Sequence, residues 1–327
     1  MKNVAIIGSG SWGVALGLHL AKRGNNIKIW SYEKEEQEII NNEKKCKFLP
    51  EIELEGNIKC YLDYEEAIKG TDIILHVAPS KFTRSMVKEY KKYVEDQPII
   101  ICSKGLEADT LYTLDKIFAE ELPNTKIGVL SGPSHAEEVS KEIPTAIVVA
   151  SIYDDVIEMV QSLFMNENLR VYASKDVVGV GVGGALKNII AFSAGIAAGL
   201  GMGDNTFAAL VTRGLKEIAT LGIVIGGKKE TFYGLTGLGD LIVTCLSEHS
   251  RNRKAGILIA KGKTIEETRK EVGMVIEGLD NIEIAQKLSK IHNVEMPILN
   301  TLYDVLYNNL PLNEAVISLM TREKKME

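Results

Sequence analysis

Residues 3–13 read NVAIIGSGSWG, an apolar run followed by three glycines in G-x-G-x-x-G spacing. The run at residues 3–7 predicts a buried strand, and the apolar residues between positions 14 and 21 follow helical spacing. Between a strand and a helix, Gly8 permits a tight turn, Gly10 lets the backbone approach a pyrophosphate, and Gly13 lets the helix pack on the strand. We therefore predict a dinucleotide-binding turn; the alternative is a tight turn that binds nothing.

The residues after the second predicted strand affect the choice of dinucleotide. At this place an acidic residue holds the ribose hydroxyls of NAD, whereas an arginine accommodates the 2′-phosphate of NADP. The sequence reads Trp30-Ser31-Tyr32-Glu33-Lys34 and holds no arginine. Glu33 would repel a phosphate if it pointed inward, although Lys34 would offset that repulsion. We expect NAD or NADP as the cofactor, with the local chemistry favouring NAD.

The first half of the chain alternates runs rich in valine and isoleucine with helical patterns, and from about residue 175 only helical patterns follow. Such alternation predicts βαβ units around a sheet buried on both faces. We predict an α/β protein with a Rossmann-like, doubly wound, mostly parallel sheet over residues 1–180 and an all-helical substrate-binding and catalytic domain over residues 181–327. The expected strands are residues 3–7, 26–30, 58–62, 72–77, 98–103, 126–130 and 145–150, and the expected later helices are residues 183–200, 205–225, 254–261, 264–271, 279–292 and 297–307.

Composition excludes several classes of function. The 327 residues include 38 Lys+Arg and 44 Asp+Glu, a formal net charge of −6. We expect no nucleic acid and no anionic membrane surface as partner, because both require a positive surface. The four cysteines lack metal-ligand spacing, so we expect buried thiols in a cytoplasmic protein and no metal site. The apolar stretch at residues 177–203 is interrupted by Lys187, which predicts a buried helix and no integral membrane segment.

Candidate ligand-binding residues lie at the ends of predicted strands. Ligands of doubly wound sheets bind beyond the carboxyl ends of the strands, and Lys104 and Ser134 follow two such ends. Lys104 is a candidate contact to an anion or a carbonyl, with a solvated loop lysine as the alternative. Lys187 lies within the apolar stretch GGALKNII, where it must snorkel outward, pair with a carboxylate or line a cleft. It is a candidate acid/base, with a snorkelling structural lysine as the alternative.

Two further motifs suit a phosphorylated substrate. Asp240 ends GLGD, which predicts a flexible turn that presents the carboxylate to a cleft. Residues 250–254 read SRNRK and predict a helix start. Arginine side chains and the free N–H groups of a helix N-terminus form a natural phosphate site. The alternative for SRNRK is a solvated helix start.

Together these motifs resemble those of the bacterial NAD(P)-dependent glycerol-3-phosphate dehydrogenases. The resemblance covers essentially the whole chain. It implies an oxidoreductase that reversibly reduces dihydroxyacetone phosphate to sn-glycerol 3-phosphate, a small three-carbon substrate, for glycerophospholipid synthesis. The motifs that carry it, in chain order, are GSGSWG at 8–13, SKGLE at 103–107, SGPSHA at 131–136, PTAI at 144–147, GGALKN at 183–188, GLGD at 237–240, SRNR at 250–253 and VIEG at 275–278.

The resemblance also implies residue roles. Lys187 would be the catalytic acid/base, supported by Lys104 and Asp240. Many family members have arginine or histidine near position 32, so Tyr32 leaves an NADP preference open. The implied substrate contacts are Lys104, Gly132, Ser134, Lys187, Asp240, Ser250, Arg251 and Asn252. The implied cofactor contacts, besides Gly8, Gly10 and Gly13, are Ser11, Trp12, Tyr32, Lys104, Ala136, Arg251, Val275 and Glu277.

Two alternatives stay open at this point. One is another two-domain dehydrogenase that acts on a hydroxy acid or a phosphorylated sugar acid, although GLGD together with SRNR is not expected there. The other is a catalytically silent nucleotide sensor, which Lys104, Lys187 and Asp240 together disfavour. The apolar, glycine-rich segments of the second domain would suit a homodimer interface, so we count a homodimer among the expected partners.

Overall fold

A computed structural model describes residues 1–324 and 326 of the chain. They form two units. The first comprises Met1–Gly105 and Tyr112–Gly181, and the second comprises Leu106–Leu111 and Val182–Glu327. The short segment Leu106–Leu111 therefore belongs to the second unit, although the chain on either side of it belongs to the first.

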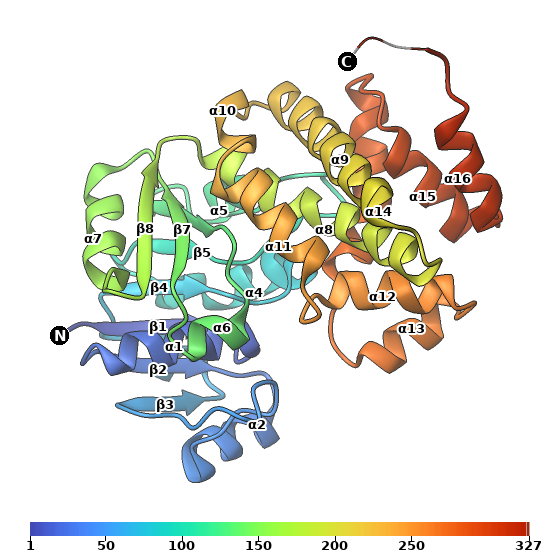
Figure 1. Ribbon diagram of the computed structural model, residues 1–327. Helices are drawn as coiled ribbons and strands as arrows, with labels where there is room; N and C mark the ends of the chain where they lie inside the picture. Colours follow the sequence, from blue (N-terminus) through green and yellow to red (C-terminus); the bar gives the residue numbers. More distant parts are fainter. Residues whose placement is uncertain (325, 327) are drawn as a thin grey trace. The chain divides into compact units, whose positions relative to one another are not determined.

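The first unit is built on an eight-stranded sheet in the order β3-β2-β1-β4-β5-β6-β7-β8 (Figure 1). Every pair is parallel except β6 with β7. The first six strands have the order of a dinucleotide-binding sheet: β2 and β3 are added on one side of β1, and β4 to β6 are added on the other side. This confirms the predicted Rossmann-like sheet. The strands are β1 Asn3–Ile7, β2 Asn26–Trp30, β3 Ile58–Tyr61, β4 Ile73–His76, β5 Ile99–Ile101, β6 Ile127–Ser131, β7 Thr145–Ala150 and β8 Leu169–Ser174.

The edge strand β8 is not among the predicted strands. It pairs in parallel with β7, from Thr145 opposite Leu169 onward. Leu169 and Val171 are buried, whereas Arg170 and Tyr172 are exposed. This alternation belongs to a strand with one solvated face, unlike the continuous apolar runs of the inner strands.

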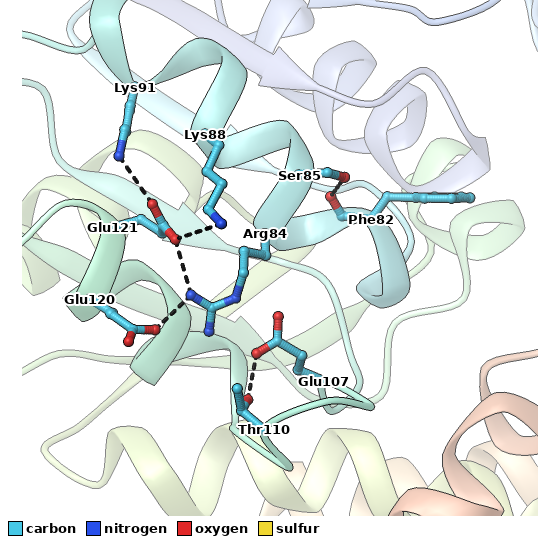
Figure 2. Close-up of polar contacts among 9 residues, drawn as sticks. All are labelled: Phe82, Arg84, Ser85, Lys88, Lys91, Glu107, Thr110, Glu120 and Glu121. Atoms are coloured by element: carbon cyan, nitrogen blue, oxygen red, sulfur yellow. Dashed lines mark hydrogen bonds and ion pairs between the residues drawn. The ribbon is translucent and has the colours of Figure 1, made fainter.

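Helices pack in two groups on this sheet. α1 (Ser11–Lys22) packs against α6 (Ala136–Ser140) and α7 (Asp154–Phe164), and α4 (Thr83–Tyr90) packs against α5 (Leu114–Glu121). A doubly wound connection places two such groups on opposite faces of the sheet. Figure 2 shows ion pairs with Glu120 and Glu121 of α5, made by Arg84 and Lys88 of α4 and by Lys91, the residue directly after α4. The other helices of this unit are α2 Lys34–Glu38 and α3 Tyr64–Ile68.

The second unit is helical. α8 (Val177–Gly199) starts in the first unit and continues into the second after Gly181. By length and composition α8 could cross a membrane, but 78% of its most apolar window is buried inside the protein, as in the core helix of a soluble protein. The prediction of a buried helix is confirmed. The other helices are α9 Asp204–Val224, α10 Lys229–Phe232, α11 Asp240–Leu246, α12 Arg251–Ala260, α13 Ile265–Val272, α14 Glu277–Ile291, α15 Pro297–Tyr307 and α16 Leu312–Met320.

Glycines let α8 and α12 touch backbone to backbone. A Cβ on Gly195 would lie 2.1 Å from the Arg253 carbonyl oxygen, and one on Gly256 would lie 2.0 Å from that of Phe192. This crossing brings the start of α12 beside α8. The predicted buried thiols are also confirmed, since all four cysteines are buried and free.

Candidate active site

The glycine turn follows β1, where the strand order of the sheet reverses. Gly8 has a φ of +125°, and a Cβ there would lie 3.1 Å from the Val77 carbonyl oxygen. A Cβ on Gly13 would lie 2.1 Å from the carbonyl oxygen of Gly8, so the first turn of α1 must carry a glycine. A Cβ on Gly10 would meet no atom within 4 Å. Gly8 and Gly13 therefore shape the turn, whereas Gly10 borders open space.

The start of α1 offers several hydrogen-bond donors to an anion. Gly10 is the N-cap and no side chain caps the helix, so Ser11 and its neighbours leave backbone N–H groups available. The first turn of α1 holds no acidic residue. Trp12 adds a buried indole N–H that has no partner within residues 1–324 and 326. These donors, with the space at Gly10, fit the pyrophosphate of a dinucleotide.

A pair of serines joins the glycine turn to the end of β2. The hydroxyls of Ser9 and Ser31 are 2.8 Å apart, and Ser31 Oγ accepts a hydrogen bond from the Glu33 N–H at 3.2 Å. Ser31 is buried, and Tyr32 is 88% exposed. Neither serine is among the predicted site residues; the signal for Ser31 was its position directly after the second strand. Glu33 is also exposed and directly precedes α2.

Three predicted substrate-binding residues meet at the ends of β5 and β6. Lys104 Nζ donates to the Gly132 carbonyl oxygen at 3.2 Å, and Ser134 Oγ donates to the same oxygen at 2.9 Å. Gly132 has a φ of +133°, which favours glycine, and a Cβ there would lie 3.0 Å from the Ile147 backbone. Lys104 is half-buried. Ala136, a predicted cofactor contact, is the first residue of α6.

In the second unit, Lys187 of α8 forms a buried ion pair with Asp240. The two residues are 5% and 1% exposed. Lys187 Nζ also donates to Thr244 Oγ1 at 2.7 Å, and that hydroxyl donates to the Asp240 carbonyl oxygen at 2.6 Å. The sequence left three possibilities for Lys187, namely to snorkel outward, to pair with a carboxylate or to line a cleft. The structure shows the pairing with a carboxylate. Thr244 is not among the predicted residues, although it lies one helical turn after Asp240.

The predicted flexible turn at GLGD is wrong. Leu235–Gly239 forms a π-helical turn, and Asp240 is the first residue of α11. The cause is a close contact between this turn and α8, because a Cβ on Gly183 would lie 2.7 Å from the Thr236 carbonyl oxygen. This close packing brings the start of α11, and with it Asp240, next to Lys187.

The SRNR motif begins α12, three residues before the predicted start at residue 254. Ser250 is the N-cap, and its Oγ accepts a hydrogen bond from the Arg253 N–H at 3.2 Å. Arg251 is exposed and donates to the Val275 carbonyl oxygen at 2.8 Å. The structure therefore brings together Arg251 and Val275, two of the predicted cofactor contacts. Glu277, a third, is the first residue of α14 and is half-buried.

Asn252 links three elements of the second unit. Its Nδ2 donates to Asn188 Oδ1 at 3.0 Å, and its Oδ1 accepts from the Gly278 N–H at 2.8 Å. Asn188 directly follows Lys187 on α8, so this bridge ties the start of α12 to the neighbourhood of the ion pair. An amide carries two N–H bonds, and the Asn188 bond uses one of them.

The predicted residues divide between the two units. The contacts between predicted residues that are described above each lie within one unit. The first unit holds Gly8, Gly10, Ser11, Trp12, Gly13, Tyr32, Lys104, Gly132, Ser134 and Ala136, and the second holds Lys187, Asp240, Ser250, Arg251, Asn252, Val275 and Glu277.

Comparisons with known proteins agree with the resemblance seen in the sequence. Residues 3–156 match the model of the N-terminal part of NAD-dependent glycerol-3-phosphate dehydrogenase, and residues 176–317 match that of its C-terminal part. A glycerol-3-phosphate dehydrogenase (NAD(P)+) of Fusobacterium nucleatum is 51% identical over 332 residues, covering 100% of this chain and 99% of that protein. One of Clostridium perfringens is 47% identical over 329 residues, with 100% and 99% covered.

Solved structures agree as well. The crystal structure of glycerol-3-phosphate dehydrogenase from Coxiella burnetii superposes with a TM-score of 0.95 at 36% identity and covers 98% of this chain and 99% of that one. This likeness extends over both units, and the two family models together cover most of the chain. The chain therefore belongs to the NAD(P)-dependent glycerol-3-phosphate dehydrogenase family of oxidoreductases.

Proposed function

We propose that Lys187 is the acid/base in the reversible reduction of dihydroxyacetone phosphate to sn-glycerol 3-phosphate. The observation that carries this role is the buried Lys187–Asp240 pair with Thr244 as a third partner. The nicotinamide, when bound, supplies the hydride. Lys187 Nζ donates a proton to the oxygen of the substrate carbonyl as that oxygen becomes an alkoxide, and Asp240 and Thr244 hold the amine in place. Lys104 stabilises the same developing negative charge.

The substrate phosphate would bind at the start of α12. Ser250 has a hydroxyl proton to donate, Arg251 carries a guanidinium, and Asn252 has one N–H beyond the bond to Asn188. Binding the phosphate away from the reacting carbon positions the carbonyl for transfer. Gly132 and Ser134 would contact the substrate beside Lys104.

The cofactor would bind at the glycine turn in residues 1–180, the proposed dinucleotide-binding domain, with residues 181–327 as the substrate-binding and catalytic domain. Gly8 and Gly13 shape the turn, and Gly10 leaves the space that the pyrophosphate would fill. After β2, the exposed Glu33 and the lack of an arginine within residues 30–34 favour NADH over NADPH. The further proposed contacts are Ser11, Trp12, Tyr32, Lys104, Ala136, Arg251, Val275 and Glu277.

A cytoplasmic location, a role in glycerophospholipid synthesis and a homodimer complete the proposal. The glycine-rich helix α8 is mostly buried within its own chain, so a dimer interface would have to use other surfaces. Light scattering of the purified protein tests the homodimer.

The activity is tested by the loss of nicotinamide absorbance with dihydroxyacetone phosphate, run in parallel with NADH and NADPH. We expect turnover, with a higher kcat/KM for NADH. Lys187→Met should lower kcat about 10²- to 10⁴-fold while NADH still binds. Wild-type turnover by this variant would exclude Lys187 as the acid/base, and a higher kcat/KM with NADPH would exclude the proposed preference.

A further inference from the structure

The chain leaves the first unit directly after the segment that carries Lys104. Leu106–Leu111 belong to the second unit, where they form a turn of their own. The Leu111 N–H donates to the Glu107 carbonyl oxygen at 3.0 Å. Thr110 Oγ1 donates to the Glu107 carboxylate at 2.5 Å, the contact drawn in Figure 2. Leu106 is the first residue of this segment, so its anchor acts where the second unit begins to hold the chain after Lys104.

One side chain of α14 holds that first residue. Asn281 is 0% exposed, and its Oδ1 accepts a hydrogen bond from the Leu106 N–H at 3.1 Å. Because a backbone N–H can only donate, the amide must turn its oxygen towards Leu106 and its Nδ2 away from it. That Nδ2 is buried and finds no partner in the part of the chain that the structure describes. Among the described residues, the hydrogen bond that the side-chain amide of Asn281 makes is the one from the Leu106 N–H.

A fully buried amide with one hydrogen bond is costly in a helical core. Leucine has nearly the same size and would pack at this position without an unpartnered N–H group. The amide of Asn281 is therefore explained by the anchoring of Leu106 and not by packing. Leu106 follows Lys104 by two residues, so their Cα atoms are at most about 7 Å apart.

The chain just before Lys104 is anchored as well. In the first unit, Ser103 Oγ donates to the Ala78 carbonyl oxygen at 2.5 Å. Lys104 thus lies between one fixed residue on its N-terminal side and one on its C-terminal side. We infer that Asn281 is a positioning residue for the reaction: by holding Leu106 it sets the place of the Lys104 backbone, and so the point where Lys104 Nζ meets the substrate. This inference rests on the proposed role of Lys104.

The test measures kcat/KM for dihydroxyacetone phosphate with NADH, together with the Tm, in a set of full-length variants. Asn281→Leu removes the acceptor and keeps the size, and we expect kcat/KM to fall about 10- to 100-fold with a Tm close to that of the wild type. Asn281→Asp keeps an acceptor oxygen, so it should retain more kcat/KM than Asn281→Leu even though burying a carboxyl group lowers its Tm. Ser289→Ala, which removes a buried polar group elsewhere on α14, the Ser289 hydroxyl, is the matched control and should leave kcat/KM unchanged.

A double-mutant cycle separates positioning from general stability. In a Lys104→Met background, Asn281→Leu should change kcat/KM less than about twofold, because the residue through which Asn281 acts is gone. An equal loss in both backgrounds, or a fall in Tm that parallels the loss of activity, would overturn the inference. If Lys104→Met lowers kcat/KM and Asn281→Leu does not, the role of Asn281 is wrong and that of Lys104 stands. Wild-type activity of Lys104→Met would instead refute the proposed role of Lys104.

Discussion

Breaking the buried pair of Lys187 and Asp240 should destabilise the protein more when one partner is removed than when both are. Both side chains are almost completely buried, so Lys187→Met leaves a carboxylate and Asp240→Leu leaves an ammonium without its partner. Loss of one member of a buried pair costs about 3–5 kcal/mol, which for units of this size is a fall in Tm of about 6–20 °C. Lys187→Met/Asp240→Leu replaces the pair by apolar groups of similar volume and should regain most of this loss.

Activity should follow a different pattern. Lys187→Met and the double variant should both have kcat lowered about 10²- to 10⁴-fold, since neither holds a proton donor at this place. Thr244→Val removes one hydrogen bond of Lys187. We expect it to lower the free energy of unfolding by about 1.5–3 kcal/mol, which is less than the loss expected when the Asp240 carboxylate is removed. Thermal denaturation followed by circular dichroism, with NADH oxidation on the same samples, measures both effects. If the Tm of the double variant falls by the sum of the two single losses, the coupling between Lys187 and Asp240 is refuted. Full kcat without Lys187 would refute its role as the acid/base.

Two further predictions concern the glycine turn and a buried carboxylate. Gly13→Ala should lower the Tm because its Cβ would lie 2.1 Å from the Gly8 carbonyl oxygen, whereas Gly10→Ala should keep the Tm and weaken NADH binding, as measured by fluorescence titration; equal Tm losses would contradict this. Glu217 is buried and accepts hydrogen bonds from the Ile298 and Leu299 N–H groups at 2.7 and 3.2 Å, and burial raises the pKa of its carboxyl to about 7. A raised pKa means that the stability contribution is full below the ordinary value of 4.5 and is lost as pH rises through 7. Relative to Glu217→Gln, the wild type should therefore lose up to about 3 kcal/mol of unfolding free energy between pH 5 and pH 8, and parallel pH profiles from denaturant titrations would disprove this.

The sheet and the glycine turn could be predicted because their signals are local. An apolar run ending at Gly8 requires only the residues next to it to be recognised as strand and turn. The edge strand Leu169–Ser174 was missed because half of its residues face solvent and it lacks the continuous apolar run of the inner strands. The SRNRK stretch was predicted to start a helix, but the helix itself was placed from residue 254, three residues after the observed start of α12.

The candidate site could be predicted in part, through motifs that carry a known chemistry. Lys187 stood out because a charge within an apolar stretch needs a partner. The sequence did not show that Asp240 begins a helix, since two glycines in GLGD equally suit a flexible turn. The packing of that segment on α8 brings the carboxylate, and Thr244 one helical turn later, to the lysine.

The amino-acid pattern alone therefore established the parallel sheet, the dinucleotide turn, the helical second half and the chemical character of the site residues, because periodicity and turn chemistry act over a few neighbouring residues. Tertiary structure alone decided which side chains meet. Lys187 and Asp240 are 53 residues apart in sequence, and Leu106 and Asn281 are 175 apart. Such pairs form only when packed helices and turns bring them within hydrogen-bond distance, and no local pattern records that distance.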